Sequence, residues 1–127
     1  VTPKIKEVDQ ILQAQPGLRP RVLEAHPELL FATFSGAPMR YSKKQAAGQD
    51  ERIQLLERNG LMPRSVLSSL YERTRKSAVQ IDDVLDAMVL YLLGLSKPEP
   101  LLSESVIDAC GLAVNYQMPA SRRGASL

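Results

Sequence analysis

Only two segments of the chain have the pattern of a β-strand, and this limits the fold more than any other feature. Arg21–His26 is short, rich in apolar residues and followed by Pro27, which predicts a buried strand. Gly111–Met118 alternates apolar and polar residues and predicts a final strand. A sheet of two strands cannot bury helices on its faces. We therefore expect its partner strands to be missing or supplied by another chain.

Most of the remaining chain has the apolar spacing of helices. The spacing predicts helices over residues 3–14, 46–59 and 63–76, and a last one from about Ile81 to Leu95. In the last helix we expect one buried stripe made of Ile81, Val84, Leu85, Met88, Leu92 and Leu95. Residues 29–34 either extend the first strand or form a helical turn, and residues 97–100 are a predicted linker. The pattern indicates an α/β protein.

Composition excludes several classes of protein. At 127 residues and 44% hydrophobic content, the chain has the size and composition of one globular domain. Its net charge of +2 is too small to indicate a nucleic-acid partner by itself. The single cysteine, Cys110, rules out an internal disulfide framework and favours a cytoplasmic location. The most apolar run, Val84–Leu95, is broken by Asp86, so we expect no membrane span.

Because the chain begins at Val1, close to its first helical pattern, we interpret it as a piece of a longer protein or a processed one.

Three carboxylates lie within five positions near the start of the last helix. Asp83 and Asp86 share one helix face, and Asp82 and Asp86 share a neighbouring one. Like charges at these spacings repel, so another group must compensate. Asp82 can cap the helix and Asp83 suits its dipole, although Ser77 and Gln80 offer a competing start. Asp86 has no such explanation and is a candidate cation ligand.

The second acidic candidate is Glu24, in the first predicted strand. A buried glutamate must be paired, protonated or bound to metal, whereas one at a strand end can lean into solvent or pair with an arginine. Mg²⁺ needs only one or two carboxylates plus substrate phosphates, and two such ions can drive phosphoryl displacement. His26 is a possible base or ligand, but a histidine beside a proline more often anchors the backbone. We interpret Glu28 as a helix-start carboxylate.

Two groups of basic residues are candidates for binding phosphate. Lys43 and Lys44 occupy a loop that leads into a helix, where they either face solvent or hold a phosphate. Arg73, Arg75 and Lys76 form a cluster that either attracts a polyanion or ends a helix favourably with positive charge.

Several short motifs follow one another in a fixed order along the chain. They are Glu24-Ala-His-Pro-Glu28, Phe31, Ser42-Lys-Lys44, Gly48, Arg52, Leu55-Leu56 and Asp82-Asp-Val-Leu-Asp-Ala87. This ordered set resembles an uncharacterised family of predicted RNase H-like nucleases (domain of unknown function family 429). The segment Lys4–Asp9 also resembles the one that leads into the family's Glu-x-His-Pro-Glu strand. The resemblance covers about Lys4 to Met118.

The resemblance implies an RNase H-like fold, a mixed sheet flanked by helices, in which acidic residues hold divalent metal ions for phosphodiester hydrolysis. Glu24 matches the family's strand glutamate, and Asp83 and Asp86 match the Asp-x-x-Asp of the last helix. The resemblance thus implies that these three residues are catalytic and bind Mg²⁺ or Mn²⁺, while Asp82 matches a helix cap. Lys43 and Lys44 match the family's paired lysines.

The chain departs from the RNase H-like pattern at its beginning. That fold starts with antiparallel strands, the first of which carries a central aspartate, and nothing before Lys4 supplies one; Asp9 is not a substitute. The chain therefore resembles the C-terminal half of the fold, with a partial domain at residues 1–118 and a flexible tail at residues 119–127. Without the central aspartate we expect weak metal binding and no activity from this chain alone.

Three functions are consistent with these observations. The first is the C-terminal portion of a metal-dependent nuclease. The second is a non-catalytic scaffold for binding or oligomerisation, in which exposed strand edges and helix faces pair with a second copy or another partner chain. The third, a small helical nucleic-acid binder, is weakest, because an aromatic content of 5% provides no stacking platform.

Overall fold

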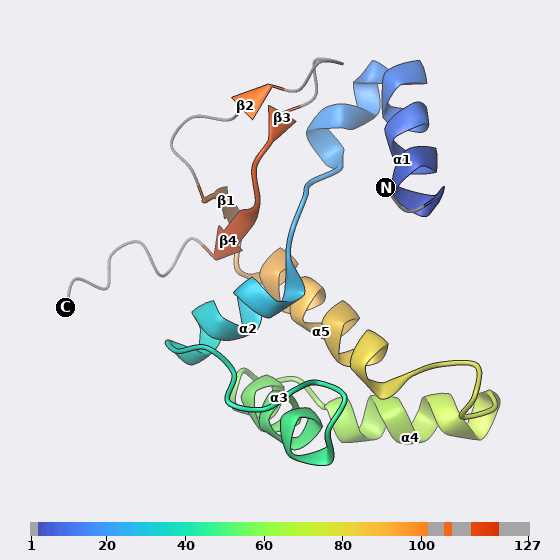
Figure 1. Cartoon of the computed structure of the whole chain (residues 1–127), viewed down its shortest axis with the longest axis vertical. Coiled ribbons are helices and arrows are strands. Elements are labelled where there is room, and N and C mark those ends of the chain that lie inside the picture. Colours follow the sequence, from blue (N-terminus) through green and yellow to red (C-terminus); the bar gives the residue numbers. More distant parts are fainter. Residues whose placement is uncertain (1–2, 102–105, 108–112, 120–127) are drawn as a thin grey trace.

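The computed structural model describes residues 3–101, 106–107 and 113–119, which form helices and short antiparallel strands (Figure 1). The α-helices are α1 (Pro3–Ala14), α2 (Pro27–Ser35), α3 (Ala46–Arg58), α4 (Pro63–Arg73) and α5 (Ile81–Leu95), and η1 (Pro16–Arg21) is a 3₁₀ helix. The strands are β1 (Pro98–Pro100), β2 (Val106–Ile107), β3 (Ala113–Val114) and β4 (Gln117–Pro119). The predicted helices at residues 3–14, 46–59 and 81–95 are confirmed within one residue, and the helix predicted at 63–76 ends at Arg73.

Helices α2, α3 and α5 share the hydrophobic core. Helix α2 crosses α5, and α3 and α4 pack at the opposite end of α5 from the strands (Figure 1). The core consists of Leu30, Phe31 and Phe34 from α2, Ile53, Leu55 and Leu56 from α3, and Leu85, Val89, Leu92 and Leu93 from α5. The described chain is therefore of mixed α/β class and mostly helical.

Local sequence explains where the helices begin and end. Helix α2 has Pro27 at its first position, where the missing N–H costs nothing, and ends at Gly36, whose φ of 83° suits glycine. This settles the open choice at residues 29–34 in favour of a helix. Gly60, with φ of 86°, follows α3, and Pro63 starts α4.

The predicted strand at Arg21–His26 is wrong. Residues up to Arg21 belong to η1, and Glu24 makes only a parallel bridge to Tyr116, in which the Gln117 N–H donates to the Glu24 carbonyl at 2.8 Å. Pro20 and Pro27 lack the N–H that strand pairing requires, so little chain between them is left to pair.

The described strands form two antiparallel pairs in place of the expected mixed sheet. Strand β1 pairs with β4, with Glu99 opposite Met118, and β2 pairs with β3. Strand β1 occupies the predicted linker at residues 97–100, so that prediction is wrong. The predicted strand Gly111–Met118 is confirmed in part, by β3 and β4. The predicted tail at 119–127 begins with Pro119 of β4, and its residues 120–127, residues 111–112 and Cys110 lie outside the described residues.

Helix α5 is apolar on two faces, and the predicted stripe is therefore only partly right. The core face carries Leu85 and Leu92 as predicted, but it also includes Val89 and Leu93 and begins with the buried Asp82. Leu95, predicted to be buried, is 59% exposed. No helix among the described residues is long and apolar enough to cross a membrane.

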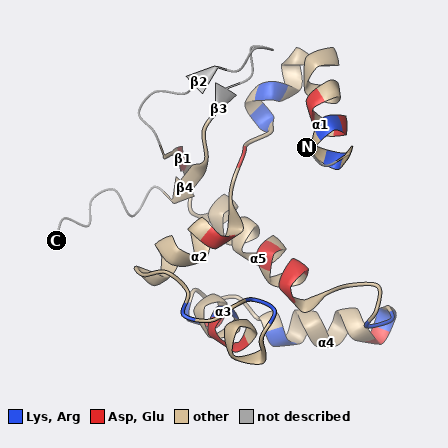
Figure 2. Ribbon diagram, viewed as in Figure 1, with Lys and Arg blue, Asp and Glu red and all other residues tan. Residues whose placement is uncertain are grey.

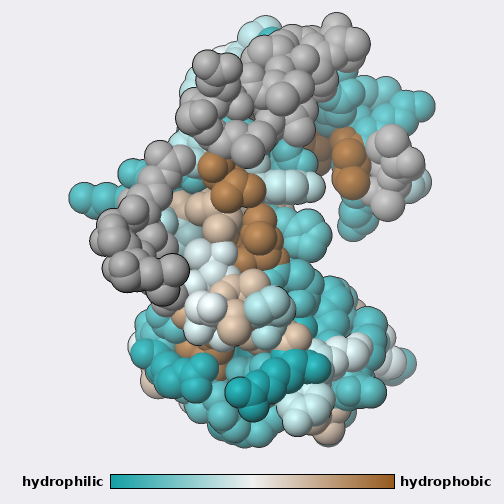
Figure 3. Space-filling view, turned by 60° about the vertical axis from the view of Figure 1, so that its left-hand side comes forward, coloured by the Kyte–Doolittle hydropathy of each residue, from teal (hydrophilic) through white to brown (hydrophobic). Residues whose placement is uncertain are grey.

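Helix α1 lies apart from the helical body and packs against η1 (Figure 1). Every residue of α1 is exposed or only partly buried. In the space-filling view, hydrophobic residues also gather on the surface at the waist of the molecule, between the helical body and the part that carries α1 (Figure 3).

Candidate functional site

The loop between α2 and α3 carries the paired lysines and is fastened to α3 through its backbone. We call residues 37–45 the lysine loop. The Glu51 carboxylate, on α3, accepts hydrogen bonds from the backbone N–H groups of Arg40 at 3.0 Å and Tyr41 at 3.2 Å. The loop follows Gly36, the C-cap of α2, and ends at Gln45, the N-cap of α3. The backbone positions of the two lysines are therefore set by α3.

Gly48 and Arg52 complete this attachment one helical turn apart. A β-carbon at Gly48 would overlap the Ser42 carbonyl group, so only glycine allows the loop to lie this close to α3. The Arg52 Nη1 donates to the carbonyl oxygens of Tyr41 at 3.1 Å and Gly48 at 2.8 Å. The Arg52 side chain, only 3% exposed, also forms a two-pronged ion pair with Glu28 at 2.9–3.3 Å.

The lysine loop brings both lysines onto the first turns of α5. The Lys43 Nζ donates to the Asp86 Oδ2 at 2.8 Å and lies 3.9 Å from the Asp82 Oδ2. The Lys44 Nζ donates to the same Asp82 oxygen at 2.7 Å. We call Lys43, Lys44, Asp82 and Asp86 the acid–lysine cluster; Figure 2 shows the basic loop and the acidic turns of α5 that form it.

The charges of the cluster stabilise each other. The hydrogen bond to Asp86 is the main cause that raises the pKa of Lys43, against a smaller opposing effect of burial. The hydrogen bond from Lys44 lowers the pKa of Asp82, although the Asp82 side chain is only 4% exposed. Both groups therefore stay charged, and the lysines offset the repulsion between carboxylates four residues apart on one helix.

One oxygen of the cluster has no partner. The Asp86 Oδ1 is buried, and no group of the described residues donates a hydrogen bond to it. An unsatisfied buried carboxylate oxygen is costly, so the site favours a bound cation or donor there.

The three carboxylates that the resemblance grouped together lie in different surroundings. Asp86 lies in the cluster, and Asp83, one turn before it on α5, is exposed and lines a groove against α4. Glu24 is exposed and lies in the connection between η1 and α2. The N-cap of α5 is Gln80, so the interpretation of Asp82 as the cap is wrong; Asp82 instead binds the lysines.

The remaining candidates lie outside the cluster. Arg73, Arg75 and Lys76 are exposed at and just after the end of α4, and the Lys76 Nζ lies 5.7 Å from the centre of the Tyr71 ring. His26 caps α2, with its Nδ1 accepting from the Leu29 N–H at 3.5 Å, which confirms the interpretation as a backbone anchor. Glu28 lies in the first turn of α2, as interpreted.

A metal site of three protein ligands is not formed within the described part of the chain. There, no group of three or more His, Cys, Asp or Glu side chains is placed to hold a metal ion. Asp82 and Asp86 are nevertheless hard oxygen donors, the kind that Mg²⁺ and Mn²⁺ prefer, and Mg²⁺ often uses only one or two carboxylates. The free Asp86 Oδ1 fits such an ion.

Sequence reasoning missed two parts of this site, the role of Asp82 and the attachment of the loop by Glu51 and Arg52. The attachment of the loop could have been inferred from the spacing of Gly48 and Arg52, which are four residues apart and share one face of α3.

Comparison with known proteins identifies one family. Residues 1–101 match the family model described as "Protein of unknown function (DUF429)". No curated protein and no solved structure shows significant similarity to the chain.

Proposed function

The chain belongs to the DUF429 family of proteins of unknown function, and we propose that it contributes to a metal-dependent phosphodiester hydrolase. In this proposal Asp82 and Asp86 hold Mg²⁺ or Mn²⁺, and Lys43 and Lys44 bind the phosphates of a nucleic-acid substrate. The RNase H-like fold and the placement of the chain in its C-terminal half are parts of the same proposal and derive from the resemblance.

One observation supports this assignment above all others. The Lys43 ammonium lies 2.8 Å from the Asp86 Oδ2 and 3.9 Å from the Asp82 Oδ2, so two carboxylates on one helix face share a single cation position. The Asp86 Oδ1 beside it is buried without a partner among the described residues. When bound, a divalent ion supplies Lewis-acid polarisation of a phosphoryl oxygen.

The residues of the chain itself then have separate tasks. The two aspartates provide negative charge at a point that α5 holds in place. With an ion held by the aspartates, Lys43 and Lys44 would provide ammonium groups that attract the phosphate backbone. The attachment of the lysine loop to Glu51 and Arg52 would keep these ammonium groups beside Asp82 and Asp86.

Titration with Mn²⁺, followed by the loss of the free-ion signal in electron paramagnetic resonance, tests the proposal on the 127-residue chain. Wild type is expected to bind Mn²⁺ saturably, and Asp86→Asn and Asp82→Asn are each expected to weaken binding by tenfold or more, as roughly expected for the loss of one charged ligand. Glu72→Gln, which removes one exposed charge from α4, is the matched control. Saturable binding that survives Asp86→Asn contradicts the proposal.

The same titration distinguishes the proposed ligands from the set that the resemblance implied. If Glu24, Asp83 and Asp86 are the ligands, Glu24→Gln and Asp83→Asn will weaken Mn²⁺ binding while Asp82→Asn will not. Mn²⁺-dependent retention of labelled DNA and RNA strands then reports the phosphate-binding task of the lysines, which Lys44→Gln is expected to weaken.

A further inference from the structure

Helix α1 exposes a row of apolar side chains that ends in a positive charge. Ile5, Val8 and Ile11 are 60%, 47% and 49% exposed, and Leu12 continues the row. Lys4 is four residues before Val8, so it extends the same face at its N-terminal end. An amphipathic helix with its apolar face in water is an unstable arrangement unless another surface covers it.

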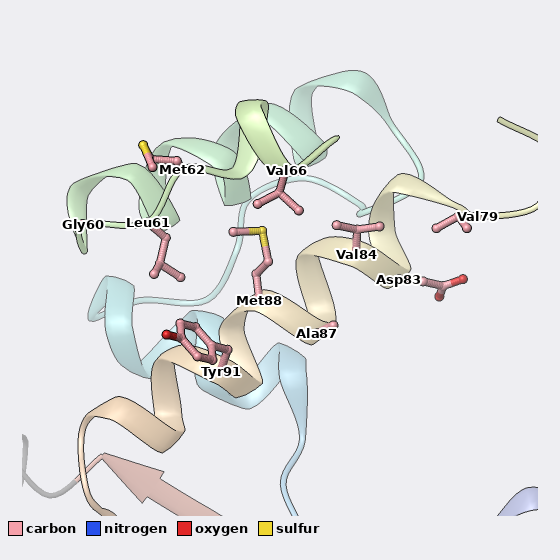
Figure 4. Close-up of a pocket in the computed structure, with 10 residues that line it drawn as sticks. All are labelled: Gly60, Leu61, Met62, Val66, Val79, Asp83, Val84, Ala87, Met88 and Tyr91. Atoms are coloured by element: carbon pink, nitrogen blue, oxygen red, sulfur yellow. The ribbon is translucent and has the colours of Figure 1, made fainter. Parts of the chain in front are cut away.

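A groove of about 600 Å³ lies between α4 and α5 (Figure 4). Its described lining is apolar except for one charged residue, Asp83, which lies near the start of α5, while Tyr91 lies toward the other end. The lining residues are Gly60, Leu61, Met62, Val66, Val79, Asp83, Val84, Ala87, Met88 and Tyr91. Met62 and Tyr91 are 70% and 61% exposed, so this groove is also an apolar surface in water.

The row on α1 and the groove match in length and in charge. Lys4 and Leu12 are eight residues apart, and so are Asp83 and Tyr91, which gives about 12 Å along either helix. Each surface carries a charge at one end, Lys4 on α1 and Asp83 in the groove, while Glu7 and Asp9 flank the row on α1. With α1 parallel to α5, Lys4 would meet Asp83 while the apolar row fills the groove.

In the observed arrangement, helix α1 cannot reach the α4–α5 groove of its own chain. Helix α1 lies at the opposite end of the molecule from α4, and it is joined to the helical body through η1 and the extended residues that precede α2 (Figure 1). We therefore propose that α1 of one copy docks into the α4–α5 groove of a second copy. This helix-in-groove contact is separate from the proposed metal site and makes the chain self-associate.

Sedimentation velocity over a range of protein concentrations tests this docking. Wild type is expected to self-associate, and Val8→Glu on α1 and Ala87→Glu in the groove are each expected to weaken association about tenfold or more. Ala87 is exposed, so its replacement fills the groove without disturbing the core. Gln10→Glu, on the opposite face of α1, is the matched control and is expected to change association less than twofold. Circular dichroism melting checks that each variant folds.

A charge exchange tests the orientation. Lys4→Glu and Asp83→Lys are each expected to weaken association several-fold, and an equimolar mixture of the two variants is expected to restore it, because each helix then meets a groove of opposite charge. Lys6→Glu, on the other face of α1, is the control. A wild-type chain that stays monomeric overturns the proposal. So does association that Val8→Glu weakens and Ala87→Glu does not, because α1 would then be pairing with α1.

Discussion

Replacement of Gly48 by alanine is expected to detach the lysine loop from α3. The new β-carbon would overlap the Ser42 carbonyl oxygen and lie 2.5 Å from the Ser42 carbonyl carbon and 2.9 Å from the Tyr41 carbonyl oxygen. These are backbone atoms, which no side-chain rotation can move away. Overpacking of this kind costs about 1–3 kcal/mol. The partly exposed ion pairs of Lys43 and Lys44 add at most about 1 kcal/mol when they are lost, and the better helix propensity of alanine returns up to about 1 kcal/mol.

The net expectation for Gly48→Ala is a loss of about 1–3 kcal/mol in the free energy of unfolding. Thermal melting followed by circular dichroism should show Tm lower by roughly 3–5 °C for each kcal/mol in a chain of this size. Gly94→Ala in α5 is the matched control, because no described atom beyond the adjacent residues and the backbone of α5 itself lies within 4 Å of a β-carbon there. It should raise Tm. A Gly48→Ala variant as stable as wild type would refute the close-approach argument.

Three other variants probe the same network. Arg52→Lys keeps the charge but loses the planar guanidinium that binds Glu28 and two carbonyl groups. Urea denaturation should therefore show a free energy of unfolding lower by about 2 kcal/mol. A decrease below about 0.5 kcal/mol would contradict this role of Arg52. Lys44 lowers the pKa of Asp82 from its ordinary value of 3.8, so the ionised Asp82 side chain stabilises the fold above this pH and loses the effect as pH falls through its lower folded pKa. Asp82→Asn should therefore flatten the dependence of Tm on pH below about pH 4. An unchanged slope would argue against the ion pair. Lys43→Met removes the ammonium that competes for the shared cation position, so Mn²⁺ affinity should rise several-fold in the titration, and a fall would contradict the competition.

The helices could be predicted from sequence because their signals are local. Pro63 begins a helix, Gly60 follows one, and Ile81 opens the apolar pattern of α5, all within a few residues of the boundaries they mark. Strand predictions were less accurate, because a strand depends on a partner far away in sequence. The run at 21–26 makes a single bridge, from Glu24 to Tyr116, whereas residues 98–100, in the predicted linker, pair along their whole length with β4.

The candidate site was half predictable for a related reason. Lys43, Lys44 and Asp86 were recognisable as charged residues in unusual places, but their pairing joins residues about forty positions apart and requires the fold. Asp82 was misinterpreted because α5 is apolar on two faces, so hydrophobic periodicity could not show which face enters the core. The buried face begins at Asp82, whose carboxylate is neutralised by the neighbouring loop.

The way the lysine loop is attached bears on which residues can vary among relatives. Helix α3 contacts the loop through main-chain atoms of residues 40–42, which any amino acid except proline provides. The contacting groups on α3 are the carboxylate of Glu51, the guanidinium of Arg52 and the bare α-carbon of Gly48. Substitutions at the exposed residues Arg40 and Tyr41, other than to proline, should accumulate over evolutionary time, while one stripe of the adjacent helix stays constant. A protein engineer could change the side chains at these positions of the lysine loop and keep the shape of its backbone.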